Sequence, residues 1–213
     1  MAPTRRHEGN LPAEVTSVVG RRRELVELRK KLAGARLITL VGPGGVGKTR
    51  LAMRAATDLG RAFPDGAWLV DLGEIMDSAL ITNVAVAALD LRDQAATEPL
   101  ALLLGYLRGK QLLLVVDNCE HVLAAAAELV SEIMKGAPGV RVIATSREPL
   151  SIGGEYLLRI PPFELPDAAE PRVRHNDAVM LFTERAVAAA GGFDLTATNQ
   201  SAEIGRASCR ERV

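Results

Sequence analysis

Short runs of apolar residues alternate with amphipathic segments along most of the chain. Runs of five or six mainly apolar residues are typical of strands in a parallel sheet that is buried on both faces. Four such runs lie at residues 37–41, 67–72, 112–116 and 140–145. A weaker run at residues 155–160 predicts a fifth strand.

Between these runs, apolar residues recur every three or four positions, which places them on one face of a helix. Helices are predicted at residues 21–32, 49–59, 77–89, 98–107, 121–134 and 176–190. Strands that alternate with helices indicate an α/β fold, in which a parallel sheet is flanked by helices on both faces.

The composition is consistent with this fold and excludes several classes of protein. The 213 residues include 26 basic and 26 acidic side chains, so no net charge attracts the chain to nucleic acid or to a membrane surface. The longest uncharged stretch, residues 78–89, is too short to cross a bilayer. Two widely spaced cysteines offer neither a disulfide framework nor a zinc site, which favours a cytoplasmic protein.

The segment after the first predicted strand has the pattern of a phosphate-binding loop. Its sequence, GPGGVGKT, matches G-x-x-x-x-G-K-[ST] at every fixed position. Glycines let successive backbone N–H groups point toward a phosphate, and the following helix adds its positive end. Lys48 is expected to reach the β- and γ-phosphates of ATP, and Thr49 to bind Mg²⁺ through its hydroxyl. The motif predicts a P-loop NTPase fold and a nucleotide site made of Gly42, Gly44, Gly45, Val46, Gly47, Lys48, Thr49 and Arg50.

Two later strands end in residues that suit the same site. The run at 112–116 is followed by Asp117, a carboxylate expected to serve Mg²⁺ at the carboxyl edge of the sheet. The run at 140–145 leads to Arg147, whose guanidinium could contact the γ-phosphate. Many related ATPases place a second acid beside the first to activate water, but Asn118 stands here and Glu120 is the only near substitute. We therefore expect catalytic roles for Lys48, Asp117 and Arg147, with slow hydrolysis.

Several segments together resemble one family. They are VVGRRREL at residues 18–25, GPGGVGKTRLA, LLLVVDNCEH, RVIATSREPL and DAVMLFTERA, in this order. The set is similar to the NB-ARC-like ATPase region of STAND-class proteins, as found in large bacterial transcriptional regulators with LuxR-type DNA-binding domains. The resemblance implies that Val19, Gly20 and Arg21 help to hold adenine and ribose. It also implies a switch in which ADP holds a closed state and ATP opens it, with self-association or binding of a partner protein.

Other classes of P-loop protein fit the sequence less well. The Asn-Lys-x-Asp segment of a GTPase is absent, and so is the Leu-Ser-Gly-Gly segment of an ABC transporter ATPase. The arginine-rich lid of a small-molecule kinase also has no counterpart at residues 90–100. The leading prediction is an ATP/ADP switch with slow ATPase activity. The alternatives are a non-hydrolysing interaction module that nucleotide stabilises, or an inactive truncated fragment.

The sequence pattern and the resemblance together divide the chain into five segments. A polar leader is expected at residues 1–17, a nucleotide-binding domain at 18–160 and a proline-rich linker at 161–175. Residues 176–202 are expected to begin a helical subdomain that is truncated. Residues 203–213, EIGRASCRERV, match one reading frame of a common sequencing adapter, so we expect an artefactual tail. DNA binding is then expected only through a C-terminal domain that this chain lacks.

Overall fold

Five parallel strands form one sheet in the order β2-β3-β4-β1-β5. The structure is a computed structural model that describes residues 9–13, 19–91, 98–164 and 176–190. The strands are β1 (Leu37–Val41), β2 (Ala67–Asp71), β3 (Leu113–Asp117), β4 (Arg141–Ser146) and β5 (Glu155–Arg159). Each strand lies within one or two residues of a predicted run, and the fifth, weaker prediction is confirmed as β5.

The predicted helices are also present. They are α1 (Arg22–Gly34), α2 (Lys48–Leu59), α3 (Ile81–Ala88), α4 (Pro99–Leu107), α5 (Leu123–Gly136) and α6 (Asp177–Ala190). Short 3₁₀ turns at Gly60–Ala62, Ser78–Leu80 and Cys119–His121 follow α2 and precede α3 and α5. No helix in the described part of the chain is long and apolar enough to cross a membrane.

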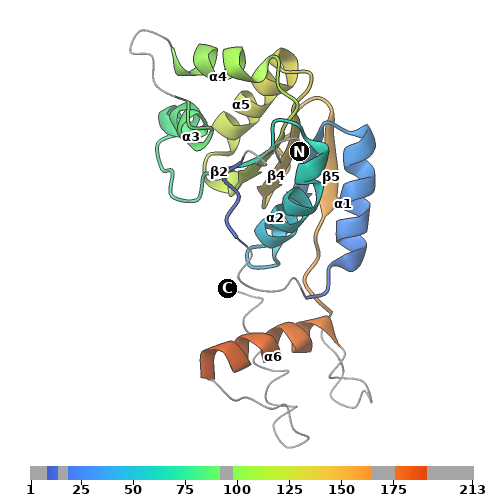
Figure 1. Cartoon of the computed structure of the whole chain (residues 1–213). Helices are drawn as coiled ribbons and strands as arrows, with labels where there is room; N and C mark the ends of the chain where they lie inside the picture. Colours follow the sequence, from blue (N-terminus) through green and yellow to red (C-terminus); the bar gives the residue numbers. More distant parts are fainter. Residues whose placement is uncertain (1–8, 14–18, 92–97, 165–175, 191–213) are drawn as a thin grey trace, which may run out of the picture.

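The sheet has a buried core on each face, because successive side chains of a strand point to opposite sides. Leu113 and Val115 of β3 pack with α1 and α2 in one core. Leu114 and Val116 pack with α3, α4 and α5 in the other core. Figure 1 shows the two sets of helices on either side of the strands, with α6 apart from both. The predicted α/β fold is confirmed.

The carboxyl ends of the strands are aligned by the register. Val41 at the end of β1 pairs with Ser146 at the end of β4, and Asp71 at the end of β2 pairs with Asp117 at the end of β3. Loops that leave these ends therefore share one edge of the sheet, where α/β proteins bind ligands. All the candidate residues that follow strands come from this edge.

The edge strand β2 has a partner near the start of the chain. Gly9 forms an isolated parallel bridge with Ala67. The Asn10 side chain accepts a hydrogen bond of 2.6 Å from the Leu69 N–H and donates one of 2.9 Å to the Leu69 carbonyl. Part of the expected polar leader thus lies against the sheet. Most of the expected linker, and the expected tail at residues 203–213, lie outside the described residues.

Candidate nucleotide-binding site

The phosphate loop runs from Gly42, after β1, into the first turn of α2. Gly45 and Gly47 have φ angles of +79° and +90°, a left-handed conformation that side chains disfavour. Gly42 is required for a different reason, because a Cβ there would lie 2.3 Å from the carbonyl oxygen of Ile160, just after β5. The glycines of the motif therefore permit both the curl of the loop and its tight start.

Lys48 folds back onto the loop that precedes it. Its Nζ donates hydrogen bonds of 2.9 Å to the carbonyl oxygens of Gly42 and Pro43. Burial lowers the pKa of Lys48, while the carboxylates of Glu120 and Asp117 act in the opposite direction. The ammonium group is thus held by two neutral carbonyls, which phosphate oxygens could replace with stronger, charge-assisted bonds.

Asp117 accepts hydrogen bonds from two threonine hydroxyls. Thr49 Oγ1, in the first turn of α2, lies 2.8 Å from Asp117 Oδ1, and Thr145 Oγ1 of β4 donates to the same oxygen. Burial raises the pKa of Asp117, and the two hydroxyls oppose that shift. A hydroxyl beside a desolvated carboxylate is an oxygen donor set that fits Mg²⁺. The structure therefore brings together Thr49 and Asp117, the two residues predicted to bind the metal.

Thr145 has a place in the site because of the strand order. Strand β4 lies between β1 and β3, so the phosphate loop and Asp117 are not on neighbouring strands. Thr145 is 1% exposed, and its hydroxyl also accepts a hydrogen bond of 3.0 Å from the Asn118 N–H. The sequence analysis missed this residue. The signal was present as a threonine next to the last position of an otherwise apolar buried strand.

Asn118 links two carboxylates. Its Nδ2 donates to Asp71 Oδ1 at 3.0 Å and to Asp117 Oδ2 at 3.1 Å. The residue has a φ of +60°, which an asparagine adopts more readily than most residues. Because an amide has no carboxylate oxygen to accept a proton, Asn118 cannot act as a base. Asp71 was also missed, although it ends the strand next to β3.

Arg147 lies over the phosphate loop and pairs with Glu120. Its Nε is 3.3 Å from Glu120 Oε1, and a Cβ at Gly44 would lie 3.3 Å from its Nη2. The Arg147 side chain is 59% exposed, whereas that of Glu120 is 14% exposed. The predicted proximity of Arg147 to the loop is present, and its pairing with Glu120 was not foreseen.

The segment expected to hold adenine enters α1 beside the loop. The Arg21 side chain is buried and donates to the carbonyl oxygens of Val46 at 3.2 Å and Pro161 at 2.6 Å. Its guanidinium lies 3.9 Å from the centre of the Phe163 ring. These contacts fix the guanidinium beside the phosphate loop, while its Nε is buried with no hydrogen-bond partner among the described residues.

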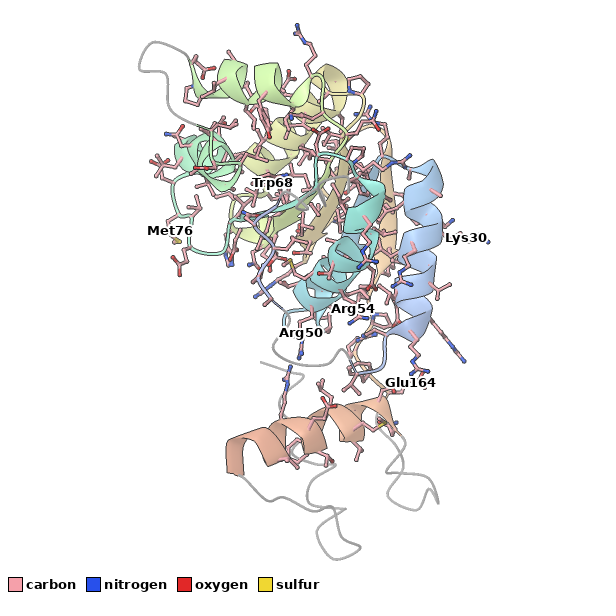
Figure 2. The ribbon with its side chains drawn as sticks, viewed as in Figure 1. Lys30, Arg50, Arg54, Trp68, Met76 and Glu164 are labelled. Atoms are coloured by element: carbon pink, nitrogen blue, oxygen red, sulfur yellow. The ribbon has the colours of Figure 1, made fainter. Side chains whose placement is uncertain are left out.

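Two further residues near the site have defined surroundings. Arg50 is the third residue of α2 and is half-buried, and it projects from the end of α2 that faces α6 (Figure 2). Cys119 Sγ donates to the Val116 carbonyl at 3.5 Å, and burial raises the pKa of this thiol to about 12. A thiol with so high a pKa is inert as a nucleophile or ligand at neutral pH. Cys119 is therefore a residue of the hydrophobic core and has no role in the nucleotide site.

A comparison with protein families matches residues 21–152 to the NB-ARC domain. The chain is 35% identical over 183 residues to the uncharacterized protein Rv0894 of Mycobacterium tuberculosis, covering 86% of this chain and 42% of that protein. It is 38% identical over 175 residues to the putative HTH-type transcriptional regulator Rv0890c of the same organism, covering 82% of this chain and 19% of that protein. The chain thus spans less than half of the length of either relative.

A solved structure shares the fold at low identity. It is a Signal Transduction ATPase with Numerous Domains (STAND) protein with a tetratricopeptide repeat sensor from Pyrococcus horikoshii. The match has a TM-score of 0.52 and 16% sequence identity, and it covers 93% of this chain and 34% of that one.

Proposed function

We propose, on the premise that this chain belongs to the NB-ARC domain family, that it is an ATP- and ADP-binding switch module with slow ATPase activity. The observation that carries the proposal is the convergence of four side chains at one edge of the sheet. They are Lys48, Thr49, Asp117 and Arg147: Lys48 binds carbonyl oxygens of the loop, Thr49 binds Asp117, and Arg147 lies against Gly44 of the loop.

Each of these side chains has a distinct role in the proposal. The loop N–H groups and Lys48 bind the phosphates of the nucleotide, because a buried cation and helix dipole favour an anion. Thr49 and Asp117 would hold Mg²⁺, which supplies charge neutralisation between phosphates. Arg147 is exposed and lies against Gly44 of the loop, where it would contact a γ-phosphate and so distinguish ATP from ADP. Val19, Gly20 and Arg21 contribute contacts on the adenine side.

The proposed biological setting is a signal-transducing transcriptional regulator. The relative named as a putative HTH-type transcriptional regulator supports this setting, since 82% of this chain matches part of it. DNA binding, of LuxR type in our proposal, belongs to a domain outside the matched region, and self-association or a partner protein reads the nucleotide state. The sparse cysteines support a cytoplasmic location.

One observation favours a second candidate. Asn118 stands beside Asp117, where a carboxylate would help to activate water. The second candidate is therefore a module that binds nucleotide for stability and does not hydrolyse it. Release of phosphate from ATP by wild type but not by Asp117→Asn would favour the switch. Binding without phosphate release in either form would favour the second candidate.

Titration calorimetry with Mg²⁺ and ATP tests the binding itself. We expect Lys48→Ala to weaken affinity by about 10- to 100-fold, since a charge-assisted contact is worth about 1.5–3 kcal/mol. Lys30→Ala is the matched control, because Lys30 points outward from α1 (Figure 2) and is exposed. GTP should compete more weakly than ATP, as no guanine-reading acid is evident in the sequence. Equal affinities for wild type and Lys48→Ala would refute the assignment of the loop.

A further inference from the structure

The two carboxylate oxygens of Glu120 have different surroundings. Oε1 lies 3.3 Å from Arg147 Nε in a single ion pair. Oε2 is buried and has no hydrogen-bond partner among the described residues. A buried carboxylate oxygen that accepts no hydrogen bond is energetically unfavourable, and a water molecule that donates to Oε2 would relieve this cost.

Glu120 also lies at the phosphate end of the site. Its carboxylate raises the pKa of Lys48 more than that of Asp117 does, so it is the stronger electrostatic partner of the loop lysine. Its partner Arg147 is the residue that lies against Gly44. Glu120 follows Asp117 by three positions and lies within the 3₁₀ turn Cys119–His121.

We infer that Glu120 is the carboxylate that activates water in this protein, and that Arg147 holds it inactive until a γ-phosphate draws the guanidinium away. This inference rests on the proposed ATPase function. The γ-phosphate carries more negative charge than one carboxylate and offers a bidentate partner for arginine, so it competes for Arg147. ADP lacks this group and leaves the Arg147–Glu120 pair intact.

The chemical step is balanced with water as the co-reactant. The oxygen of the water molecule bonds to the γ-phosphorus while Glu120 takes a proton from that water. The bond from that phosphorus to the bridging oxygen of the β-phosphate breaks, and its electron pair leaves with ADP. The proton then passes from Glu120 to the phosphate product or to solvent, which restores the carboxylate for the next turnover.

A rival base is available on the neighbouring strand. Asp71 ends β2 beside Asp117 and is exposed, but the Asn118 amide and the Gly73 N–H both donate to its Oδ1. Its strand β2 is separated from β1, which leads into the phosphate loop, by both β3 and β4. This strand order places Asp71 on the far side of Asp117 from the loop lysine.

Single-turnover release of phosphate from labelled ATP by the 213-residue chain tests the assignment. Glu120→Gln should slow release by about 100-fold or more, as expected for loss of a general base. Glu148→Gln is the matched control, because Glu148 is exposed and adjacent to Arg147 in sequence. Asp71→Asn should retain most of the rate. A full rate in Glu120→Gln, or a collapse only in Asp71→Asn, would overturn the inference.

A binding measurement separates catalysis from structure. Because Glu120→Gln frees Arg147, it should raise affinity for a non-hydrolysable ATP analogue several-fold while leaving ADP affinity nearly unchanged. Arg147→Ala should lower affinity for the analogue alone. An unchanged ratio of the two affinities in Glu120→Gln would contradict the Arg147 part of the inference.

The outcomes distinguish this inference from the function on which it rests. If wild type binds no nucleotide, the proposed function fails and this inference fails with it. If wild type binds ATP and releases phosphate while Glu120→Gln does so at the same rate, only the role of Glu120 is refuted. If wild type binds ATP and releases no phosphate, the binding proposal stands and Glu120 is not a base.

Discussion

Thr49 donates a hydrogen bond of 2.8 Å to Asp117, a residue 68 positions later in the chain. The bond joins the first turn of α2 to the end of β3, across the intervening strand β4. A loop that binds phosphates and a carboxylate that serves a metal are thereby fixed to one another. Changes at this junction should therefore alter both the stability of the fold and its response to nucleotide.

The hydroxyl of Thr145 should be worth measurable stability. Thr145→Val keeps the shape of the side chain but removes the donor to Asp117 and the acceptor for the Asn118 N–H. We expect the free energy of unfolding to fall by about 1–3 kcal/mol in urea denaturation, since a buried carboxylate loses a hydrogen bond.

Thr39→Val is the control for Thr145→Val, because it removes a buried hydroxyl that makes no hydrogen bond among the described residues. Thr39 is fully buried in β1, and its Oγ1 has no hydrogen-bond partner among the described residues. Replacing an unsatisfied hydroxyl with a methyl group should leave stability unchanged or raise it. A loss at Thr39 equal to that at Thr145 would show that the bonds to Asp117 contribute nothing specific.

The raised pKa of Asp117 predicts a pH effect on stability. Burial raises this pKa above its ordinary value of 3.8, so the folded protein binds a proton at Asp117 more tightly than the unfolded chain does. Stability from this group is therefore present at low pH and is lost as the pH rises from 3.8 through the folded pKa. In thermal denaturation, wild type should lose stability relative to Asp117→Asn across that window.

Wild type and Asp117→Asn can also be compared at neutral pH by the effect of ligand on their unfolding temperatures. Addition of Mg²⁺ and ATP should raise the unfolding temperature of wild type more than that of Asp117→Asn, because bound ligand stabilises only the folded state. If the unfolding temperatures of wild type and Asp117→Asn differ by the same amount at every pH, with and without ligand, the environment described for Asp117 is contradicted.

Arg21 should resist replacement by lysine. Its guanidinium donates to Glu24 and to the carbonyl oxygens of Val46 and Pro161, and a single ammonium cannot reproduce this fork. Arg21→Lys should cost about 2–3 kcal/mol of stability, since hydrogen bonds from a charged donor are lost in a buried position. Arg22→Lys, at an exposed neighbouring position, should change stability by less than about 0.5 kcal/mol. Equal effects would refute a structural role for the Arg21 fork.

Two substitutions of glycine by alanine should change the free energy of unfolding in opposite directions. Gly42→Ala places a methyl group 2.3 Å from the Ile160 carbonyl oxygen, so the loop or β5 must move at a cost of about 1–3 kcal/mol. Gly34→Ala, at the end of α1, meets no atom within 4 Å and should stabilise by about 0.5–1 kcal/mol. Differential scanning calorimetry of both variants checks this, and a stabilised Gly42→Ala would contradict the geometry of the loop.

The sequence was sufficient to predict the elements and the phosphate loop, because both depend on local periodicity and on a contiguous motif. The insertion of β4 between β1 and β3 was not predictable in this way, since strand order leaves no periodic signal. Thr145 and the Arg147–Glu120 pair were missed for the same reason, as they depend on residues 28 and 27 positions apart in the chain. The motif that contains Arg21 was recognised from the sequence, whereas the hydrogen bonds of Arg21 to Val46 and Pro161 were not, because Pro161 lies 140 positions away in the chain.

The contact of Asn10 with β2 bears on how the protein behaves at high concentration. An edge strand with unpaired N–H and carbonyl groups is a template on which another chain can add a strand. Asn10 occupies both backbone groups of Leu69, and Gly9 pairs with Ala67, so this template is partly blocked. A chain trimmed to begin after Asn10 should therefore aggregate at lower concentration than the 213-residue chain, through its uncovered edge.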